Sequence, residues 1–329
     1  MAPSLSSSWT QSFPAKPTFT EKDLPDLSGK VYIITGANTG IGKELARILY
    51  AQNAKLYLLT RDESKTQTAI QEIQSSSPKS AGSLHHIHLD LSDLASVKTG
   101  ANKFLASESR LDVLFNNAGY MGPEGAIERT SAGHEMHMGV NCVGTFLLTK
   151  LLTPVLLSTA SEQTITARVV YISSFAAELF GEKNTGLDMD NLDYHKADRA
   201  AKYRYGVSKL GNWAYSIDLC KRYKSQGLIG VAVNPGNIRT ELFRQQGAVF
   251  RFLTDPVSYP VINGAYSLLF AGLSPEVTVD KAGEYVIPFG RFGAIRADLK
   301  AATREEGEGG NGTTRQFWEW SEEQVKAFL

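Results

Sequence analysis

Short apolar runs alternate along this chain with longer segments whose apolar residues repeat at helical spacing. Strands that alternate with helices predict a parallel sheet covered by helices on both faces. The expected fold is therefore α/β, a doubly wound parallel sheet in a single domain. The expected strands are Val31–Ile34, Lys55–Leu59, Leu84–Leu89, Leu111–Phe115, Arg168–Ile172, Ile229–Val233 and Glu284–Ile287.

Composition narrows the class of protein. Lys plus Arg and Asp plus Glu both number 34, so the chain lacks the basic excess of a nucleic-acid-binding protein. Two cysteines, Cys142 and Cys220, are too few for a disulfide framework and fit a reducing compartment. The N-terminus has no apolar signal region, and no run of about 20 apolar residues predicts a membrane span. We expect a cytoplasmic protein.

A glycine-rich turn follows the first expected strand and precedes a helix. Glycines let the backbone turn tightly and approach a pyrophosphate, and the helix N-terminus offers free N–H groups to phosphate oxygens. An ordinary loop is the alternative, but the position between strand and helix favours dinucleotide binding. The candidate cofactor-binding residues of this turn are Gly36, Asn38, Thr39, Gly40, Ile41 and Gly42.

The second strand ends in Thr60-Arg61. Folds that prefer NAD place an acid at this point, whereas folds that prefer NADP use arginine to bind the 2′-phosphate. Arg61 therefore predicts NADP(H), although a solvated surface arginine is the alternative. Asp62 comes one position later, and we interpret it as a helix cap.

Tyr205 and Lys209 lie four residues apart in a helical stretch, so they share one helix face. A cation beside a phenol lowers its pKa from about 10, which would let Tyr205 act as acid and base on a substrate oxygen. Taken alone, such a pair is more often an exposed helix pair.

Polar or glycine-containing sequence also follows four other expected strands. Ligands of doubly wound folds bind beyond the carboxyl ends of the strands, so these residues should line one site. They are Asp90-Leu91, Asn116–Gly119, Ser173-Ser174 and Asn234–Gly236.

Taken together, TGANTGIG, NNAG, ISS, YGVSK and NPGNIRT resemble the short-chain dehydrogenase/reductase superfamily in order, from about Gly29 to Thr240. The ANTGIGKE, TRD and YGVSKLGN versions are similar to its retinol-dehydrogenase-like branch, which includes fungal enzymes of secondary metabolism. The resemblance implies a Rossmann-type fold and an NADP-dependent enzyme acting on CH–OH or C=O groups.

The resemblance also implies a role for individual residues. Tyr205 would be the acid/base, and Lys209 would bind the nicotinamide ribose and tune that tyrosine. Ser174 would hydrogen-bond the substrate oxygen, and Asn141 would anchor a water of the proton relay. The remaining cofactor contacts would come from Asp90, Leu91, Asn116, Ala118, Gly119, Pro235, Gly236, Ile238 and Thr240.

We divide the chain into an extended N-terminal segment (1–28), a catalytic domain (29–303), and a flexible segment with a C-terminal tail (304–329). The aromatic residues of that tail should dock on the body. Insertions at about 175–200 and 241–260 carry several aromatic residues. They predict a mid-sized apolar substrate, with simple core packing as the alternative.

Other functions stay open at this point. A sensor or scaffold that binds NADP(H) without turnover is one alternative, and a reductase of C=C or C=N bonds is another. The expected partner is a small-molecule carbonyl or alcohol, and a homodimer is one option for assembly. His134-Glu135-Met136-His137 lacks the HExxH spacing, so we predict no metal site.

Overall fold

The computed structural model describes residues 3–162, 166–240 and 258–329, and it confirms the doubly wound, Rossmann-type fold in a single domain. The strands are β1 (Val31–Thr35), β2 (Lys55–Thr60), β3 (Ser83–His88), β4 (Val113–Asn116), β5 (Ala167–Ile172), β6 (Leu228–Val233), β7 (Tyr285–Ile287) and β8 (Arg291–Gly293). The main helices are α1 (Leu5–Ser12), α2 (Gly40–Ala51), α3 (Glu63–Ser76), α4 (Leu94–Ser107), α5 (Met136–Met138), α6 (Thr145–Glu162), α7 (Phe175–Phe180), α8 (Ala201–Tyr223), α10 (Val261–Leu273), α11 (Ala297–Ala302) and α12 (Thr313–Val325).

The eight strands form one sheet in the order β3-β2-β1-β4-β5-β6-β7-β8. Strands β1 to β7 are parallel, and β8 pairs antiparallel with β7 across the short connection Pro288–Gly290. The sequence did not predict β8, because its three residues, Arg291-Phe292-Gly293, include only one apolar side chain and so form no apolar run.

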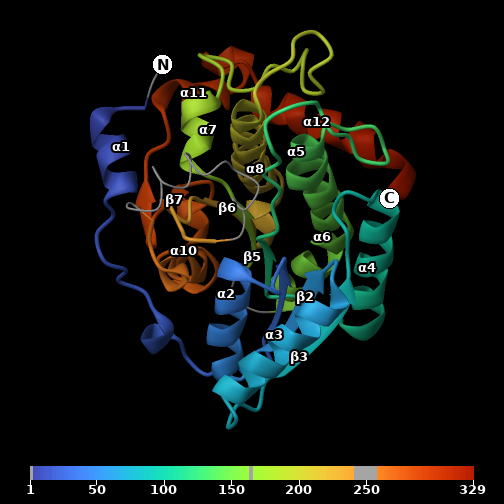
Figure 1. Ribbon diagram of the computed structural model, residues 1–329. Coiled ribbons are helices and arrows are strands. Elements are labelled where there is room, and N and C mark those ends of the chain that lie inside the picture. Colours follow the sequence, from blue (N-terminus) through green and yellow to red (C-terminus); the bar gives the residue numbers. More distant parts are fainter. Residues whose placement is uncertain (1–2, 163–165, 241–257) are drawn as a thin grey trace.

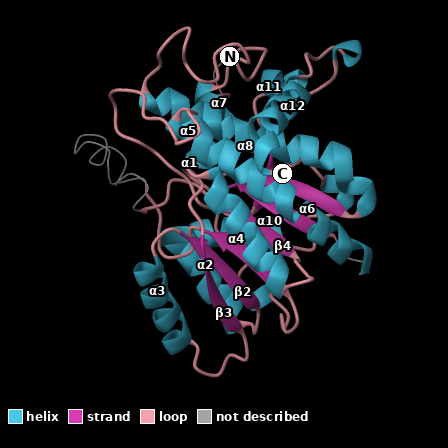
Figure 2. Ribbon diagram, turned by 90° about the vertical axis from the view of Figure 1, so that its right-hand side faces the viewer, coloured by secondary structure: helices cyan, strands magenta, loops and turns pink. Residues whose placement is uncertain are grey.

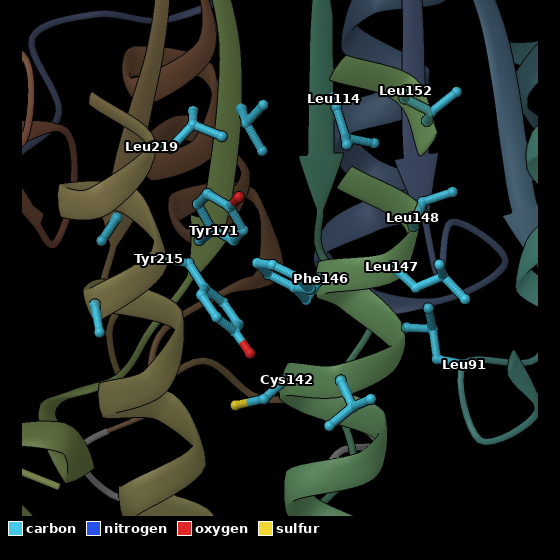
Figure 3. Close-up of a cluster of buried hydrophobic side chains, with 14 of the residues drawn as sticks. Leu91, Leu114, Cys142, Phe146, Leu147, Leu148, Leu152, Tyr171, Tyr215 and Leu219 are labelled. Atoms are coloured by element: carbon cyan, nitrogen blue, oxygen red, sulfur yellow. The ribbon is translucent and has the colours of Figure 1, made fainter. Parts of the chain in front are cut away.

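Helices cover both faces of the sheet, as Figure 2 shows from the side. Apolar residues of α2, α3 and α10 pack on one face. Those of α4, α6 and α8 pack on the other face, where rings and branched side chains meet between β4, β5 and the helices (Figure 3). Phe146 of α6 lies 5.0 Å from Tyr215 of α8, ring centroid to ring centroid. The central strands β1, β4, β5 and β6 are buried on both sides, which explains their nearly continuous apolar sequence, whereas the edge strands β3 and β8 are only partly buried.

One helical run, Met136–Ser161, is long and apolar enough to cross a membrane by length and composition. It comprises α5, the π-helical segment η2 (Gly139–Gly144) and most of α6. However, 72% of its most apolar window is buried against the rest of the protein. Burial of this extent is typical of a core helix, so the prediction of no membrane span stays our interpretation.

The N-terminal segment differs from the prediction. We expected it to run extended, but Leu5–Ser12 forms α1. The helix begins at Ser4, whose hydroxyl accepts a hydrogen bond from the Ser7 N–H group at 3.0 Å. A serine N-cap of this kind satisfies one backbone donor that the first helical turn leaves free. The Ser- and Pro-rich composition concealed this local signal.

The two insertions are described to different extents. Residues 241–257 lie outside the described residues, so the second insertion is described only at its end. The first begins with α7 and continues in turns, where Leu187 and Leu192 belong to the core and Tyr194 is buried. For these three side chains, core packing is therefore the correct interpretation.

The C-terminal part packs on the body through aromatic residues of α12. Phe317 stacks on Tyr215 of α8 at 4.9 Å between ring centroids, and Phe317 and Trp318 are buried. The segment before it, which we expected to be flexible, forms a 3₁₀ turn at Glu306–Glu308, and the Gly312 N–H group donates to the Arg304 carbonyl at 2.8 Å.

Candidate active site

The carboxyl ends of the parallel strands meet at one edge of the sheet, so the segments that follow β1, β4, β5 and β6 converge there (Figure 1). Each of these segments carries residues that the sequence singled out. They contribute the glycine turn, Asn116–Gly119, Ser174 and Asn234–Gly236, and α8 contributes Tyr205 and Lys209.

The glycine turn packs tightly against the segment after β4. Gly36 has φ +66°, and a Cβ added at Gly42 would lie 2.5 Å from Asn117 Nδ2 and 2.8 Å from the Gly36 carbonyl oxygen. The Asn117 side-chain amide donates to the Thr35 and Gly36 carbonyls at 2.8 and 3.3 Å. Glycine is therefore required here for close packing of turn, helix and strand.

Helix α2 begins without a side-chain cap. Its N-cap residue, Thr39, accepts no side-chain hydrogen bond, whereas Asp62 and Asp93 cap α3 and α4. The cap at Asp62 confirms the sequence prediction. An uncapped N-terminus keeps its first-turn N–H groups and positive dipole end available to an anion, which fits a dinucleotide pyrophosphate at Asn38–Gly42.

Arg61 projects from the end of β2, and its side chain is 65% exposed. Its Nη1 lies 3.9 Å from Asp90 Oδ2, while the other oxygen of Asp90 accepts from the Ser92 N–H group at 2.8 Å. An exposed pair at this distance contributes about 0–1 kcal/mol, so the guanidinium can exchange partners at small cost. The neighbouring Leu91 is buried.

Asn116 ends β4 and is buried. Its Nδ2 donates to Thr149 Oγ1 at 3.1 Å, but its Oδ1 has no hydrogen-bond partner among the described residues. A buried acceptor without a partner indicates a site where a ligand or water supplies the donor. The chain then passes Ala118, whose N–H group donates to Thr35 Oγ1 at 2.9 Å.

Tyr205 is buried on α8, near Ser174, the N-cap residue of α7. Burial raises the pKa of the Tyr205 hydroxyl to about 12, and the nearby Ser174 hydroxyl opposes that rise. The expectation that Lys209 lowers this pKa is therefore wrong for the chain by itself, because loss of solvation by burial dominates. The two hydroxyls come from segments 31 positions apart, and β5 and α8 bring them together. The protonated tyrosine is therefore set beside a second hydroxyl.

Lys209 lies one helical turn beyond Tyr205, with its Nζ 5.6 Å from the centre of the Tyr205 ring. The ammonium group donates to the Ile172 carbonyl at 3.0 Å, and burial lowers the Lys209 pKa to about 8. A Cβ added at Gly119 would lie 3.2 Å from Nζ, so the NNAG segment borders this charge. The charged form stays the main form at pH 7.

Asn141 is fully buried in the π-helical segment η2. Its Oδ1 accepts from the Tyr120 N–H group at 2.7 Å, and its Nδ2 donates to the Tyr120 carbonyl at 3.0 Å and to Ser208 Oγ at 2.9 Å. The side chain thus fixes the loop after NNAG against α8, close to Tyr205. Its role in a proton relay stays a prediction.

The segment after β6 lies against the glycine turn. Thr240 Cγ2 would be 3.5 Å from a Cβ added at Gly40. Gly236 has φ +95°, and the Pro235 carbonyl accepts from Ser267 Oγ at 3.3 Å. Ile238 is buried and forms a parallel bridge with Tyr259. The predicted contacts from Pro235 to Thr240 therefore border the same site.

Sequence reasoning missed several residues that hold this site. Asn212 Nδ2 donates to the same Ile172 carbonyl as Lys209, at 3.1 Å. His137 Nδ1 lies 2.6 Å from Glu135 Oε1, and its Nε2 accepts from the Gly122 N–H group at 3.1 Å. The position of Asn212 on the same helix face as Lys209 was an available signal. The contact between His137 and Gly122 joins different segments, so no spacing rule indicates it.

Known proteins resemble this chain in sequence and in structure. Residues 30–185 match the family model described as short chain dehydrogenase. A short-chain dehydrogenase/reductase of Phomopsis amygdali is 48% identical, over 99% of this chain and 98% of its own. The short-chain dehydrogenase/reductase bet4 of Neocamarosporium betae is 46% identical, over 99% and 94%.

Solved structures agree with these relatives. An uncharacterized protein of Mycobacterium paratuberculosis has a TM-score of 0.66 and 26% identity, over 94% of this chain and 97% of its own. RhlG of Pseudomonas aeruginosa, solved as an active-site complex with NADP, has a TM-score of 0.61 and 22% identity, over 83% and 97%, and shares the fold. The chain therefore belongs to the short-chain dehydrogenase/reductase family of oxidoreductases, which bind a nicotinamide dinucleotide.

Proposed function

We propose that this protein is an NADP(H)-dependent oxidoreductase that acts on a carbonyl or alcohol group of a mid-sized, apolar small molecule. The observation that carries the proposal is the buried Tyr205 of α8, with the Lys209 ammonium group 5.6 Å from its ring centre and Ser174 close enough to lower the Tyr205 pKa. A proton donor, a second hydroxyl and a fixed cation are what a carbonyl oxygen needs when charge develops on it.

Each of these residues has a separate role in the proposed hydride-transfer reaction. When bound, NADP(H) supplies or accepts the hydride. Ser174 donates a hydrogen bond to the substrate oxygen, and Tyr205 gives that oxygen a proton in reduction or takes one in oxidation. With a pKa of about 12, Tyr205 holds its proton near neutral pH and is ready for reduction. In oxidation, the positive charge of Lys209 favours the phenolate.

Arg61 supports NADP(H) as the cofactor rather than NAD(H). Its guanidinium is exposed beside the site, and the weak pair with Asp90 leaves it able to bind a phosphate. Thr60 stands where an NAD-preferring fold has an acid, and Thr60 is buried with its hydroxyl bonded to Thr66. Asp62 is engaged as the cap of α3.

The first test is turnover of NADPH or NADP⁺ with a panel of aldehydes, ketones and alcohols, compared between wild type and Tyr205→Phe. The variant keeps the ring and loses the hydroxyl, so kcat should fall about 10²–10⁴-fold while NADPH affinity stays nearly unchanged. Wild-type turnover by the Phe variant would refute the role of Tyr205. Binding of NADPH without turnover of any substrate would favour a sensor or scaffold.

The second test concerns the cofactor. Arg61→Ala should weaken NADPH binding about tenfold to a hundredfold and leave NADH binding unchanged, because only NADPH has the 2′-phosphate. Arg47→Ala is a matched control, since Arg47 is also partly exposed but pairs with Glu44 on α2. Equal NADPH and NADH affinity in the wild type would contradict the assignment.

A further inference from the structure

Helix α1 buries a polar side chain and exposes its apolar ones. Gln11 is its only buried residue, at 4% exposure, while Leu5, Trp9 and Phe13 are 91%, 67% and 50% exposed. Apolar burial therefore contributes little to holding this helix against the body. The contacts of Gln11 must account for its position.

The side-chain amide of Gln11 joins two segments that are far away in the sequence. Its Nε2 donates to Glu178 Oε1 at 2.7 Å and to Ser7 Oγ at 2.9 Å. Its Oε1 accepts from Asn234 Nδ2 at 2.8 Å. The Glu178 carboxylate only accepts and the Asn234 side-chain NH2 group only donates, so the Gln11 amide fits in one orientation.

Both partners of Gln11 belong to segments that carry site residues. Glu178 lies on α7, one helical turn after Ser174, and is 1% exposed. Asn234 follows β6, and its Oδ1 accepts from the Gly236 N–H group at 3.0 Å. Gln11 thus connects the helix that begins at Ser174 with the turn that Gly236 forms.

Other contacts support this junction. The second carboxylate oxygen of Glu178 accepts from the backbone N–H group of Arg296 at 3.0 Å. The Arg296 guanidinium donates to the backbone carbonyl of Glu178 at 2.6 Å. The chain just after α1 is held by Tyr259, whose hydroxyl donates to the Ser12 carbonyl at 3.2 Å. Figure 1 shows α1 at the same end of the molecule as α7 and α11.

We propose that Gln11 is a positioning residue for the reaction: by bonding Glu178 and Asn234 together, it sets Ser174 relative to the Pro235-Gly236 turn. In this role Gln11 acts through Glu178 and Asn234 and does not itself touch the substrate or the cofactor. The inference rests on the proposed function, because Ser174 is taken to bind the substrate oxygen and the turn to face the nicotinamide.

A reciprocal exchange tests the junction. Gln11→Glu places two carboxyl groups against each other, and Glu178→Gln leaves two amides whose donors face each other. Each single variant should lower kcat about tenfold, on the scale of one lost charge-assisted hydrogen bond. The double variant Gln11→Glu/Glu178→Gln restores a carboxylate that accepts from an amide, with Asn234 and the Arg296 N–H group still paired, so kcat should recover to within about twofold.

Two further readouts separate positioning from mere stability. NADPH affinity should change less than kcat does in the single variants, because the glycine turn and Arg61, which lie on other segments, keep their contacts with the cofactor. In Gln11→Glu, lowering the pH protonates one of the two carboxyl groups, and the shared proton restores a hydrogen bond between residues 11 and 178. The kcat of this variant should therefore approach the wild-type value as pH falls. The charged and titratable groups that face Glu178 are Arg296 and Tyr285, and both are the same in each variant. Trp9→Ala is the control on the exposed face of α1 and should keep wild-type kcat.

The outcomes are distinct. A double variant no better than the single ones, or single variants with wild-type kcat, would overturn the role of Gln11. The failure of wild-type protein to turn over any substrate would instead refute the proposed function. In that case hydrogen exchange of the Gly236 amide still tests the junction, since it should speed up in each single variant and return to the wild-type rate in the double variant.

Discussion

Replacing Gly42 by alanine tests whether the glycine turn, helix α2 and the segment after β4 form one close-packed unit. In an ordinary helix this change stabilises a protein by about 0.5–1 kcal/mol, because alanine loses less backbone entropy than glycine. At Gly42 the added methyl group would meet Asn117 Nδ2 at 2.5 Å, the Gly36 carbonyl oxygen at 2.8 Å and the Ala37 Cα at 3.1 Å.

The last two of these atoms belong to the backbone, so no side-chain rotation relieves the contact. Overpacking of this kind costs about 1–3 kcal/mol, and after the entropic gain is subtracted the net loss is about 1 kcal/mol at the middle of these ranges and about 2.5 kcal/mol at most. Displacement of Asn117 also weakens its bonds to the Thr35 and Gly36 carbonyls. The turn that is proposed to hold the pyrophosphate would shift, so we expect NADPH affinity to fall about tenfold, the equivalent of about 1.4 kcal/mol.

Urea denaturation measures the free energy of unfolding, and calorimetric titration measures NADPH binding. Gly307→Ala is the matched control, since an added Cβ there meets nothing within 4 Å and its φ is not positive. The control should change stability by less than about 0.5 kcal/mol and leave NADPH affinity unchanged. If Gly42→Ala is as stable as the wild type and binds NADPH equally well, the close-packing argument is wrong.

Three other predictions follow from the same structure. Arg296→Met removes a buried guanidinium that donates to the Glu178 and Gly181 carbonyls and to Asp298. The free energy of unfolding, measured by urea denaturation, should therefore fall by about 3–5 kcal/mol, and a loss below about 1 kcal/mol would contradict this. Burial lowers the pKa of Lys209 to about 8, so its charge is present below that pH and lost above it. NADPH affinity, measured from about pH 7 to 9.5, should therefore fall with rising pH in the wild type but not in Lys209→Met. Phe180→Ala, which alters a half-buried side chain packed on α8 beside Tyr205, should change substrate KM or preference without changing NADPH affinity, and the reverse result would make it a structural brace.

Much of the site was predictable because its residues follow strands in a parallel sheet. The apolar runs located β1 to β7, and the rule that parallel strands end at one edge brought Asn116, Ser174 and Asn234 to one place. The spacing of Tyr205 and Lys209 placed them on one helix face, and their contact across 5.6 Å agrees with that spacing. These are local periodicities, which a single sequence states directly.

The sequence by itself determined the parallel strands β1 to β7, the glycine turn and the residue types at the strand ends, because each depends on periodicity or on the conformations that glycine allows. Only the tertiary structure decided the pKa of about 8 for Lys209, since burial by other segments lowers it. It also decided that Gln11 reaches Glu178 across 167 positions. Such contacts depend on which segments far apart in the sequence pack together, and no local pattern in the sequence encodes that packing.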